Sequence, residues 1–422
     1  MRAMAAADAQ LFWLSSLVPN DQFLLYAFDG TPRHIGEVIA DIRGRARSCP
    51  ELGLRPVDDC RWRYPRWESV VPIEDQFVIH APVGQDWRDW QAALDLVGRL
   101  AQLDQDRMAW RVHILPRVRG IPAPEAPAPV AGSVVVVQIA HSLGDGNRSA
   151  ALAATLLGRR QPVRPVDRPD RGVLLWRAAV AARAHRRLIR EVGTGLAAPP
   201  GEPRPVLGVN AGRRRTAAVR TVVLNRARLP GPTVTVGALV AIADALGGYL
   251  ADRGEDISRL GAEVPMSTGP ALRAHNNFRN VGIDLLPEAG PAERADRIAA
   301  QLAGHRRRGE HPAMRASAAA FASVPAPVLR WGVGRFDPEA RSPVVSGHTV
   351  VSSVNRGPAD LMFGGNRVVM TAGYPALSPM MGLTHGVHGI GDTIAISVHA
   401  DPAIVEVDQY LDRLVRAVGA DR

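Results

Sequence analysis

The stretch that decides the fold is Val134–Gly158, which reads VVVVQIAHSLGDGNRSAALAATLLG. Val134–Val137 is a run of β-branched residues that is too short to span a membrane and suits a buried strand. His141 lies just past the expected end of this strand, and the Asp145-Gly146 turn follows it. Ser149–Leu157 is rich in small residues and indicates a helix packed closely on a neighbour. The stretch therefore predicts one imidazole held rigidly between a strand and a helix.

The composition is that of a globular protein with one large or two ordinary domains. The chain has 422 residues, of which 46% are hydrophobic and 22% are charged, so it can bury a sizeable core. The formal net charge is +10, but the arginines are spread along the chain and mostly interleaved with acids. The charge therefore argues against a nucleic-acid partner and fits an anionic ligand or a membrane surface better.

Neither the cysteines nor the apolar segments indicate a secreted or membrane-spanning protein. Cys49 and Cys60 have no metal-type spacing and do not make a disulfide framework. Asp8 interrupts the apolar N-terminal run, which lacks a signal-peptide cleavage site. No window has the roughly 18 uninterrupted apolar residues of a transmembrane helix. We expect a cytoplasmic location, with peripheral attachment to a membrane or to lipid inclusions left open.

Helical and strand patterns are mixed along the whole chain without strict βαβ alternation. Helices are expected at Asp8–Leu17, His34–Arg47, Asp89–Leu103, Val173–Val192, Thr235–Ala251, Pro291–Arg308 and Pro402–Val418, the last with Asp401 as its N-cap. Strands are expected at Gln22–Phe28, Arg111–Leu115, Val134–Gln138, Thr216–Leu224, near Val264, and at Asn280–Leu286, Val344–Val354, Arg367–Thr371 and Asp392–His399. The pattern predicts two α/β sandwiches, each a mixed sheet with helices.

Two loops organise the chain. The Pro/Ala-rich segment Ile121–Gly132 joins two strands that form either a hairpin or neighbours in a mixed sheet. The Pro/Gly/Arg-rich segment Gly193–Arg215 is the expected main boundary. We therefore expect an N-terminal domain at 1–165, a linker with a basic helix at 166–215, and a C-terminal domain at 216–422.

Two further patterns have more than one interpretation. Five of the eight tryptophans lie in one stretch, where aromatics at regular spacing favour a core over a binding platform: Trp62, Trp67, Trp87, Trp90 and Trp110. The helix Val173–Val192 gathers four arginines on one side: Arg183, Arg186, Arg187 and Arg190. It is either an ordinary crossover helix with a solvated basic face or a surface that rests on anionic lipid.

A histidine at this place can take and return a proton near neutral pH, provided that it is held in one tautomer and faces a cavity. An aspartate four residues later can tie the loop, and the glycine relieves a turn that a Cβ would obstruct. A lone His-x-x-x-Asp-Gly motif is weak evidence, and the buried strand before it and the helix after it strengthen it.

At this motif the sequence resembles a known family. Ala140-His141-Ser142-Leu143-Gly144-Asp145-Gly146 resembles the active-site motif of the bacterial wax ester synthase/acyl-CoA:diacylglycerol acyltransferases (WS/DGAT), within the condensation-domain and chloramphenicol-acetyltransferase-like superfamily. Matches in register are Trp110-Arg111-Val112-His113, Val264-Pro265-Met266-Ser267, Asn277, Leu286-Pro287, Ser353-Val354-Asn355-Arg356-Gly357-Pro358, and the run from Gly364 to Asp401. The resemblance covers nearly the whole chain.

The resemblance implies two acetyltransferase-like mixed-sheet domains around a central tunnel, where acyl-CoA and a hydroxyl acceptor meet. His141 would act as the general base, and Asp145, with Gly146, would orient the loop through an ion pair. Trp110, Ser267, Asn277 and Asn355 would be candidate substrate-binding residues. Acyl-CoA would be a substrate, and no cofactor or metal is expected.

The sequence departs from the family pattern at two places. The family usually has two adjacent histidines, and Ala140 stands here in place of the first. The second, His141, is present, and it is the one that corresponds to the family's general base. Thr235 and Val236 stand where the family typically has Asn-Asp at the opening of a helix. Thr235 can still cap that helix, but a buried polar network must be rebuilt or lost.

Other polar clusters have plainer interpretations. His385, His388, Asp392 and His399 could bind a metal, although their glycine-rich surroundings favour a loop and a strand. The run His305–Arg308 is most simply a solvated helix end, with a minor role in binding CoA phosphates left open.

The sequence leaves three functions open. The leading one is an acyl-CoA-dependent O-acyltransferase that uses diacylglycerol or a fatty alcohol. A second is an acyltransferase of the same fold that uses an amine or a polyketide or glycolipid hydroxyl. A third is a non-catalytic homologue that binds acyl chains.

Overall fold

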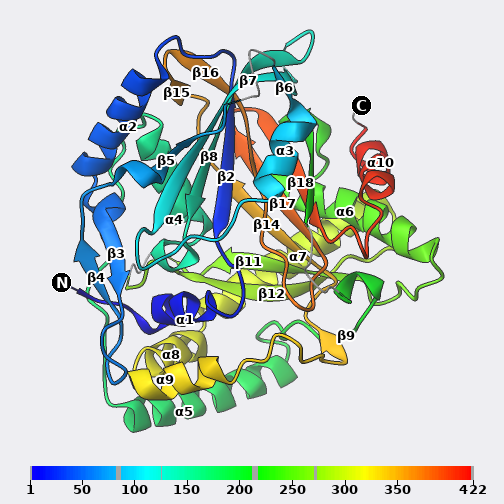
Figure 1. Ribbon diagram of the computed structural model, residues 1–422. Coiled ribbons are helices and arrows are strands. Elements are labelled where there is room, and N and C mark those ends of the chain that lie inside the picture. The colour runs from blue at the N-terminus through cyan, green and yellow to red at the C-terminus, as the bar shows by residue number, and fades with distance from the viewer. Residues whose placement is uncertain (1, 82–86, 125, 212–216, 270–272, 420–422) are drawn as a thin grey trace.

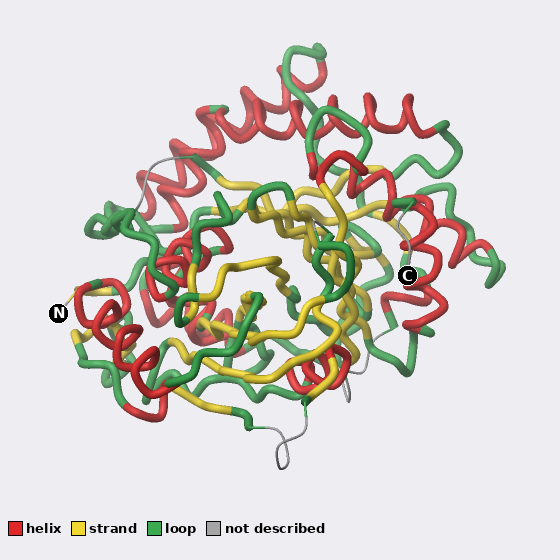
Figure 2. Tube along the Cα trace, turned by 90° about the horizontal axis from the view of Figure 1, so that it is seen from above, coloured by secondary structure: helices red, strands yellow, loops and turns green. Residues whose placement is uncertain are grey.

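The computed structural model describes residues 2–81, 87–124, 126–211, 217–269 and 273–419, and places two large mixed sheets side by side with helices on their outer faces (Figure 1). Seen from above, strands gather in the middle and helices lie around them (Figure 2). The expected α/β class is confirmed. The first sheet has the order β15 (Met362–Phe363), β16 (Asn366–Gly373), β2 (Gln22–Phe28), β8 (Val130–Ile139), β7 (Trp110–Ile121) and β5 (Phe77–Ile79), with β6 (Arg88–Asp89) also on β7.

The valine run forms the centre of this sheet. Val134–Val137 are fully buried in β8, which pairs antiparallel with β2 on one side and with β7 on the other. β7 and β8 form a hairpin, one of the two arrangements expected, with longer strands and a shorter loop than the sequence pattern indicates. After β8 the chain makes a single turn at His141–Leu143 and enters α4 (Gly146–Leu156), as the opening stretch predicts.

The second sheet has the order β10 (Ala218–Asn225), β18 (Thr393–Ala400), β17 (Leu383–Ile390), β14 (Thr349–Asn355), β11 (Gly261–Ser267) and β12 (Phe278–Asp284). It is mixed, because β14 runs parallel to both β11 and β17 while the other pairs are antiparallel. α6 (Val234–Ala251), α7 (Pro291–Glu310) and α10 (Val407–Ala417) pack on it. Within the described residues, α6 is the one helix long and apolar enough to cross a membrane, but it is mostly buried in this core.

Two neighbouring strands of the C-terminal half, β15 and β16, belong to the first sheet. β16 comes from the C-terminal half, yet it pairs antiparallel with β2 in the first sheet, where Thr371 lies opposite Tyr26. The N-terminal sheet is therefore completed by residues far along the chain. The division at residues 165 and 215 stays a prediction.

A layer of helices lies below both sheets in Figure 1. It contains α1 (Ala6–Leu14), α5 (Leu174–Gly193), α8 (Pro312–Phe321) and α9 (Ala326–Gly334). α5 packs on α8, and α1 packs on α9. The remaining elements are α2 (Ile35–Ser48), α3 (Trp90–Gly98), the small sheet of β1 (Arg2–Ala3), β4 (Arg66–Ser69) and β3 (Leu54–Val57), and the pair β9 (Arg204–Pro205) and β13 (Val344–Val345).

Several sequence expectations were wrong. The helix expected to reach Leu103 ends at Gly98. The last helix begins at Val407 with Glu406 at its N-cap, and Asp401 instead accepts the Ala403 N–H in a preceding turn, 3.0 Å away. Of the five clustered tryptophans, Trp62 is 78% exposed and Trp87 36%, whereas Trp67 and Trp110 are core residues. Thr216, where a strand was expected to begin, lies outside the described residues.

Candidate active site

A cavity of about 280 Å³ lies between the two sheets and is lined from both halves of the chain. The first half contributes residues 20–24 and the loop with His141 and Asp145. The second half contributes the ends of β11 and β12, with Ser267 and Phe278, the β14 residues 350–354 and the following Arg356. The structure therefore brings His141, Asp145 and Ser267 to one cavity.

His141 is held by one asparagine from the other half of the chain. Its Nδ1 lies 3.0 Å from the Oδ1 of Asn276. The Asn276 amide is oriented because its Nδ2 donates to the His141 carbonyl at 2.8 Å and to the Asp8 carboxylate at 3.0 Å. Since the amide oxygen must then face Nδ1, that nitrogen carries the proton. Nε2 is left with the free lone pair that a general base needs.

The surroundings of His141 keep the ring neutral. The Phe278 ring stacks on the imidazole with centroids 5.5 Å apart. Burial lowers the pKa of His141, opposed in part by hydrogen bonding and by the carboxylates of Asp145 and Asp8. A neutral imidazole at neutral pH can accept a proton from a substrate.

Asp145 fixes the loop through main-chain hydrogen bonds. One carboxylate oxygen accepts the N–H of Arg148, and the other accepts the N–H of Asn277, both at 3.0 Å. The first bond caps α4, and the second ties the loop to the other half of the chain. The expected ion pair is wrong, because the nearby Arg148 guanidinium binds Glu51 instead.

Gly146 lies at a tight contact between the two halves of the chain. A Cβ at this position would lie 3.0 Å from Cγ2 of Val354 on β14. The glycine therefore permits the close approach of α4 to the second sheet.

Asp8 anchors the asparagine that holds His141. This carboxylate is fully buried and accepts four hydrogen bonds at 3.0 Å, from the main-chain N–H and Nδ1 of His275 and from the main-chain N–H and Nδ2 of Asn276. Sequence reasoning missed both Asp8 and Asn276 as site residues. The available signal was a single acid on the mostly apolar helix α1.

The four candidate substrate-binding residues separate into two groups. Ser267 lines the cavity, and Asn277 lies beside it, where its main chain binds Asp145 and its Nδ2 donates to the Ala274 carbonyl at 2.6 Å. Asn355 is exposed and accepts the Gly357 N–H at 2.9 Å. Trp110 is buried, donates its indole N–H to the Leu52 carbonyl at 2.7 Å, and lines a different cavity of about 220 Å³.

Thr235 and Val236, which stand where the family typically has Asn-Asp, lie at the start of α6, and Thr235 still makes a polar contact. Thr233, and not Thr235 as expected, caps the helix by accepting the Val236 N–H at 3.3 Å. The Thr235 hydroxyl lies 2.8 Å from the hydroxyl of Ser353, which lines the cavity. A short hydroxyl pair therefore stands next to the cavity wall.

The C-terminal histidines lie on strands. β17 carries His385 and His388 on opposite faces. His385 bonds to the hydroxyls of Thr349 and Tyr410, at 2.8 and 2.7 Å, and His399 bonds to the Pro375 carbonyl. Among the described residues no group of three or more His, Cys, Asp or Glu is arranged to hold a metal ion.

Sequence reasoning also missed Asp21 in the cavity wall. One carboxylate oxygen accepts from the Leu103 N–H and from Gln138 Nε2, each at 2.7 Å, and the other has no partner. Burial raises the pKa of Asp21 from 3.8 to about 6.

Comparison with known proteins agrees with this architecture. Residues 277–420 match the family model of the WS/DGAT C-terminal domain. No curated protein matches the chain in sequence. The fold is similar to the wax ester synthase/diacylglycerol acyltransferase from Marinobacter aquaeolei VT8, with a TM-score of 0.61, 17% identity, and 99% and 98% of the two chains covered.

Two condensation domains are also similar. The first condensation domain of the calcium-dependent antibiotic synthetase, solved with a substrate analogue, has a TM-score of 0.61 at 17% identity, covering 100% of this chain and 97% of that one. The starter condensation domain of rhizomide synthetase, solved with C8-CoA and Leu-SNAC, has a TM-score of 0.56 at 17% identity, covering 99% and 93%. Residues 277–420 therefore resemble the WS/DGAT C-terminal domain, and the whole chain has the mixed α/β, chloramphenicol-acetyltransferase-like fold of this wax ester synthase and of the condensation domains.

Proposed function

We propose that the protein is an acyltransferase that moves a fatty acyl group from acyl-CoA to a hydroxyl acceptor, with His141 as the general base. The observation that carries the proposal is the fixed tautomer of His141 on the wall of the cavity between the halves. Asn276 holds the Nδ1 proton, which leaves Nε2 to accept one. The C-terminal domain family and a neighbour solved with C8-CoA support the choice of donor.

The proposed reaction moves one proton and one acyl group. Nε2 of His141 takes the proton of the acceptor hydroxyl as its oxygen attacks the thioester carbonyl. The tetrahedral adduct then expels the CoA thiolate, which regains the proton from the imidazolium, leaving an ester and free CoA. Asn276 and Asp8 act as positioning residues, because they hold the ring without contacting the reacting atoms. No cofactor takes part in this scheme.

Diacylglycerol or a fatty alcohol is the acceptor class that the family suggests. A second class, a polar acceptor such as a polyketide or glycolipid hydroxyl or an amine, is favoured by one observation. The cavity wall carries polar side chains among its apolar ones, namely Gln22, Asn147, Asn280 and Ser352. Such groups can hydrogen-bond a polar acceptor and fix its orientation within an otherwise apolar cavity.

The test is release of free thiol from long-chain acyl-CoA, followed with a thiol reagent in the presence of a fatty alcohol, diacylglycerol, a polar alcohol or an amine. Acceptor-dependent release is expected from the wild type, and His141→Ala should lower it by at least 100-fold. His185→Ala, on α5, is the control and should change nothing. Equal release by wild type and His141→Ala would refute the base, and no release with any acceptor would favour the acyl-binding homologue.

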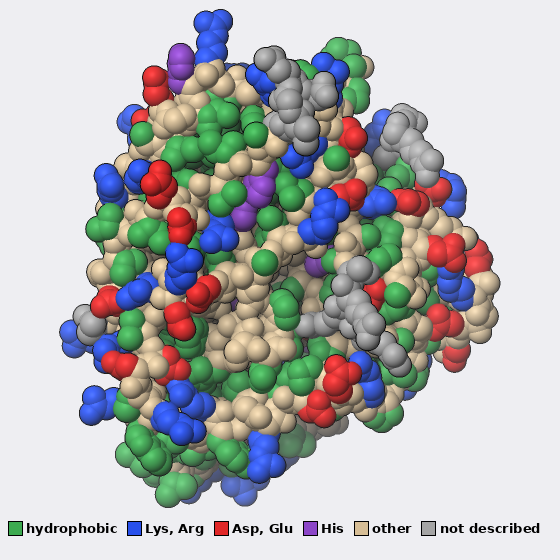
Figure 3. Space-filling model, in the orientation of Figure 1, with side chains coloured by type: hydrophobic (Ala, Val, Ile, Leu, Met, Phe, Trp, Pro, Cys, Tyr) green, Lys and Arg blue, Asp and Glu red, His purple; other side chains and the backbone are tan. Residues whose placement is uncertain are grey.

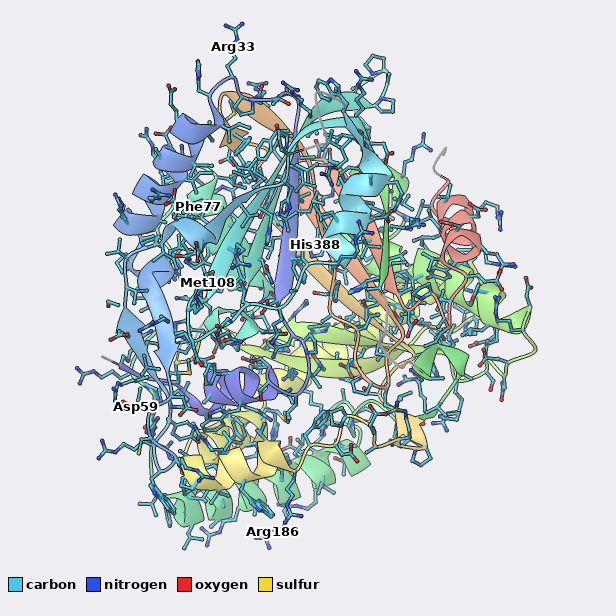
Figure 4. The ribbon with its side chains drawn as sticks, in the orientation of Figure 1. Arg33, Asp59, Phe77, Met108, Arg186 and His388 are labelled. Carbon is cyan, nitrogen blue, oxygen red and sulfur yellow. The ribbon has the colours of Figure 1, made fainter. Side chains whose placement is uncertain are left out.

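We also propose that a cytoplasmic form of the protein binds anionic membrane or lipid-inclusion surfaces through α5 and α9. Exposed apolar side chains gather there, at the lower edge of Figure 3, with Leu175 at 82% and Trp176 and Trp331 at 64% exposure. Arg186, further along α5, points outward (Figure 4). Apolar side chains bordered by arginines suit a negatively charged interface.

Sedimentation with vesicles tests this surface. The wild type should pellet with phosphatidylglycerol vesicles more than with phosphatidylcholine vesicles, and Trp176→Ser combined with Trp331→Ser should reduce pelleting. Equal pelleting by the double variant would place the lipid contact elsewhere.

A further inference from the structure

Arg356 is a buried cation without a protein counter-ion. Arg356 comes directly after β14 and lines the cavity, and only 4% of the residue is exposed. The guanidinium donates to the Leu25 carbonyl and the Thr371 hydroxyl and lies 5.0 Å from the centre of the Tyr26 ring, while Nε has no partner. In the part of the chain that the structure describes, no carboxylate lies within ion-pair distance of it.

None of the described acids that line the same cavity forms an ion pair with Arg356. Asp21 accepts from Leu103 and Gln138 through one oxygen, and its other oxygen has no partner. Asp145 accepts two main-chain N–H groups, and Glu263 accepts from Asn280 and Ser346. Burial of a charge without a counter-ion is costly, so a cavity that keeps one is prepared for an anion from outside.

His388 converges on the same point. It is 5% exposed, lines the cavity, and its Nδ1 has no hydrogen-bond partner. A Cβ at Gly373 would lie 2.7 Å from Arg356 Nη2 and 3.0 Å from His388 Nε2, so the two side-chain heads lie within about 6 Å of each other. Figure 4 shows His388 at the centre of the molecule, among the strands of the two sheets.

The protonation state of His388 suits a donor. Burial and the Arg356 guanidinium hold the pKa of His388 well below its ordinary value, so the imidazole is neutral. A neutral imidazole has one N–H, which can donate to a carboxylate oxygen that also receives a guanidinium N–H. The two side chains together therefore provide charge and a directed hydrogen bond.

We propose that Arg356 and His388 form an anion subsite that binds a carboxylate of the acceptor, so that the preferred acceptor is a hydroxy acid and not a neutral alcohol. This inference rests on the proposed function. The cavity of about 280 Å³ contains both the subsite and His141, so a group held there is close to the reacting atoms. The phosphates of CoA are separated from the thioester by the whole pantetheine arm, which makes them the poorer candidates.

The kinetic test compares a medium-chain hydroxy acid with its methyl ester and with a primary alcohol of the same length. The wild type should have a kcat/KM at least 10-fold higher for the acid. Arg356→Met should abolish that preference by lowering kcat/KM at least 10-fold more for the acid than for the ester, and His388→Gln should weaken it. Arg367→Met is the matched control, since Arg367 is exposed on β16, does not line the cavity and should leave the preference intact.

Three outcomes would overturn the proposal. The wild type could use the ester or alcohol as well as the acid. Arg356→Met could lower activity equally with all acceptors. It could instead raise the KM of acyl-CoA but not of acyl-pantetheine, which lacks the nucleotide phosphates, and the anion would then belong to the donor.

A binding measurement separates this inference from the proposed function. The His141→Ala protein, without donor, is titrated calorimetrically with the hydroxy acid and with its methyl ester. Tighter binding of the acid that disappears when Arg356→Met is added supports the subsite even if no variant turns over. If Arg356→Met does not fold, Arg356→Lys should retain the preference and His388→Gln should reduce it. Equal binding of acid and ester refutes the subsite whatever the catalytic result.

Discussion

Replacing Asp21 by asparagine should stabilise the protein, and more so at high pH. The residue is 3% exposed in the wall of the cavity. The two donors that it binds, the Leu103 N–H and Gln138 Nε2, meet the same carboxylate oxygen, and the other oxygen is unpartnered. An asparagine can place its carbonyl oxygen at the bonded position and its NH₂ at the unpartnered one. Asp21→Asn therefore keeps both hydrogen bonds and removes a buried charge.

The size of the effect follows from the pKa. Burial raises the pKa of Asp21 from 3.8 to about 6, so the folded protein binds this proton more tightly than the unfolded chain. The ionised carboxylate thus opposes folding above the folded pKa, and the penalty disappears below the unfolded value. At about 1.4 kcal/mol for each pKa unit, the penalty is at most about 3 kcal/mol at pH 8 and roughly half of that at pH 5.

Thermal unfolding at pH 5 and pH 8 measures this difference. Asp21→Asn should raise the unfolding midpoint by a few degrees at pH 8 and by about half as much at pH 5. Asp106→Asn makes the same chemical change at an exposed position and should have little effect. A gain of the same size at both pH values, or a loss at pH 8, would show that the carboxylate is ionised without cost and would refute the reasoning.

Asp145→Asn should lower the free energy of unfolding by about 1–3 kcal/mol and kcat at least 10-fold, because an amide accepts hydrogen bonds through one oxygen only. An unchanged unfolding midpoint and unchanged kinetics would contradict the two main-chain hydrogen bonds of Asp145. Thr235→Val removes the contact with the Ser353 hydroxyl and should lower the free energy of unfolding by about 1 kcal/mol. Steady-state kinetics should show a changed KM for the acceptor and an unaltered KM for the donor. Trp110→Phe loses the buried bond to Leu52 and should cost about 1–3 kcal/mol in denaturant unfolding with no change in either KM, whereas a raised KM would place this tryptophan at the substrate.

The sequence predicts the central elements well because local pattern and tertiary position agree there. The valine run and the small-residue helix around His141 have one compatible arrangement, and the structure has it. Asn276 could not be found in this way, since its place against His141 is fixed by a loop 135 residues distant. Its neighbour Asn277 was chosen from the family pattern, but it contributes its main chain to Asp145.

Other elements that the sequence analysis predicted wrongly or not at all have local causes. β17 resembles a loop because it contains two glycines, yet a Cβ at Gly386 would lie 2.0 Å from the Gly373 carbonyl oxygen. The glycine is there for close strand packing, not for a turn. Asp401-Pro402 has the pattern of a helix start, but the turn that it begins stops before α10. Neither α8, which is Ala-rich, nor α9, which is short and contains two glycines, was predicted from the sequence.

The crossing of β16 into the first sheet constrains how the protein can be made. β2 is synthesised within the first 28 residues, but its partner on one side is residues 366–373. A ribosome must therefore release most of the chain before that edge of β2 is paired. Contacts of such long sequence separation slow folding, and until they form the exposed edge can pair with another chain. Expression should consequently suffer when the gene is divided between the halves, and co-expression of residues 1–211 with 217–422 should yield more soluble protein than either half alone.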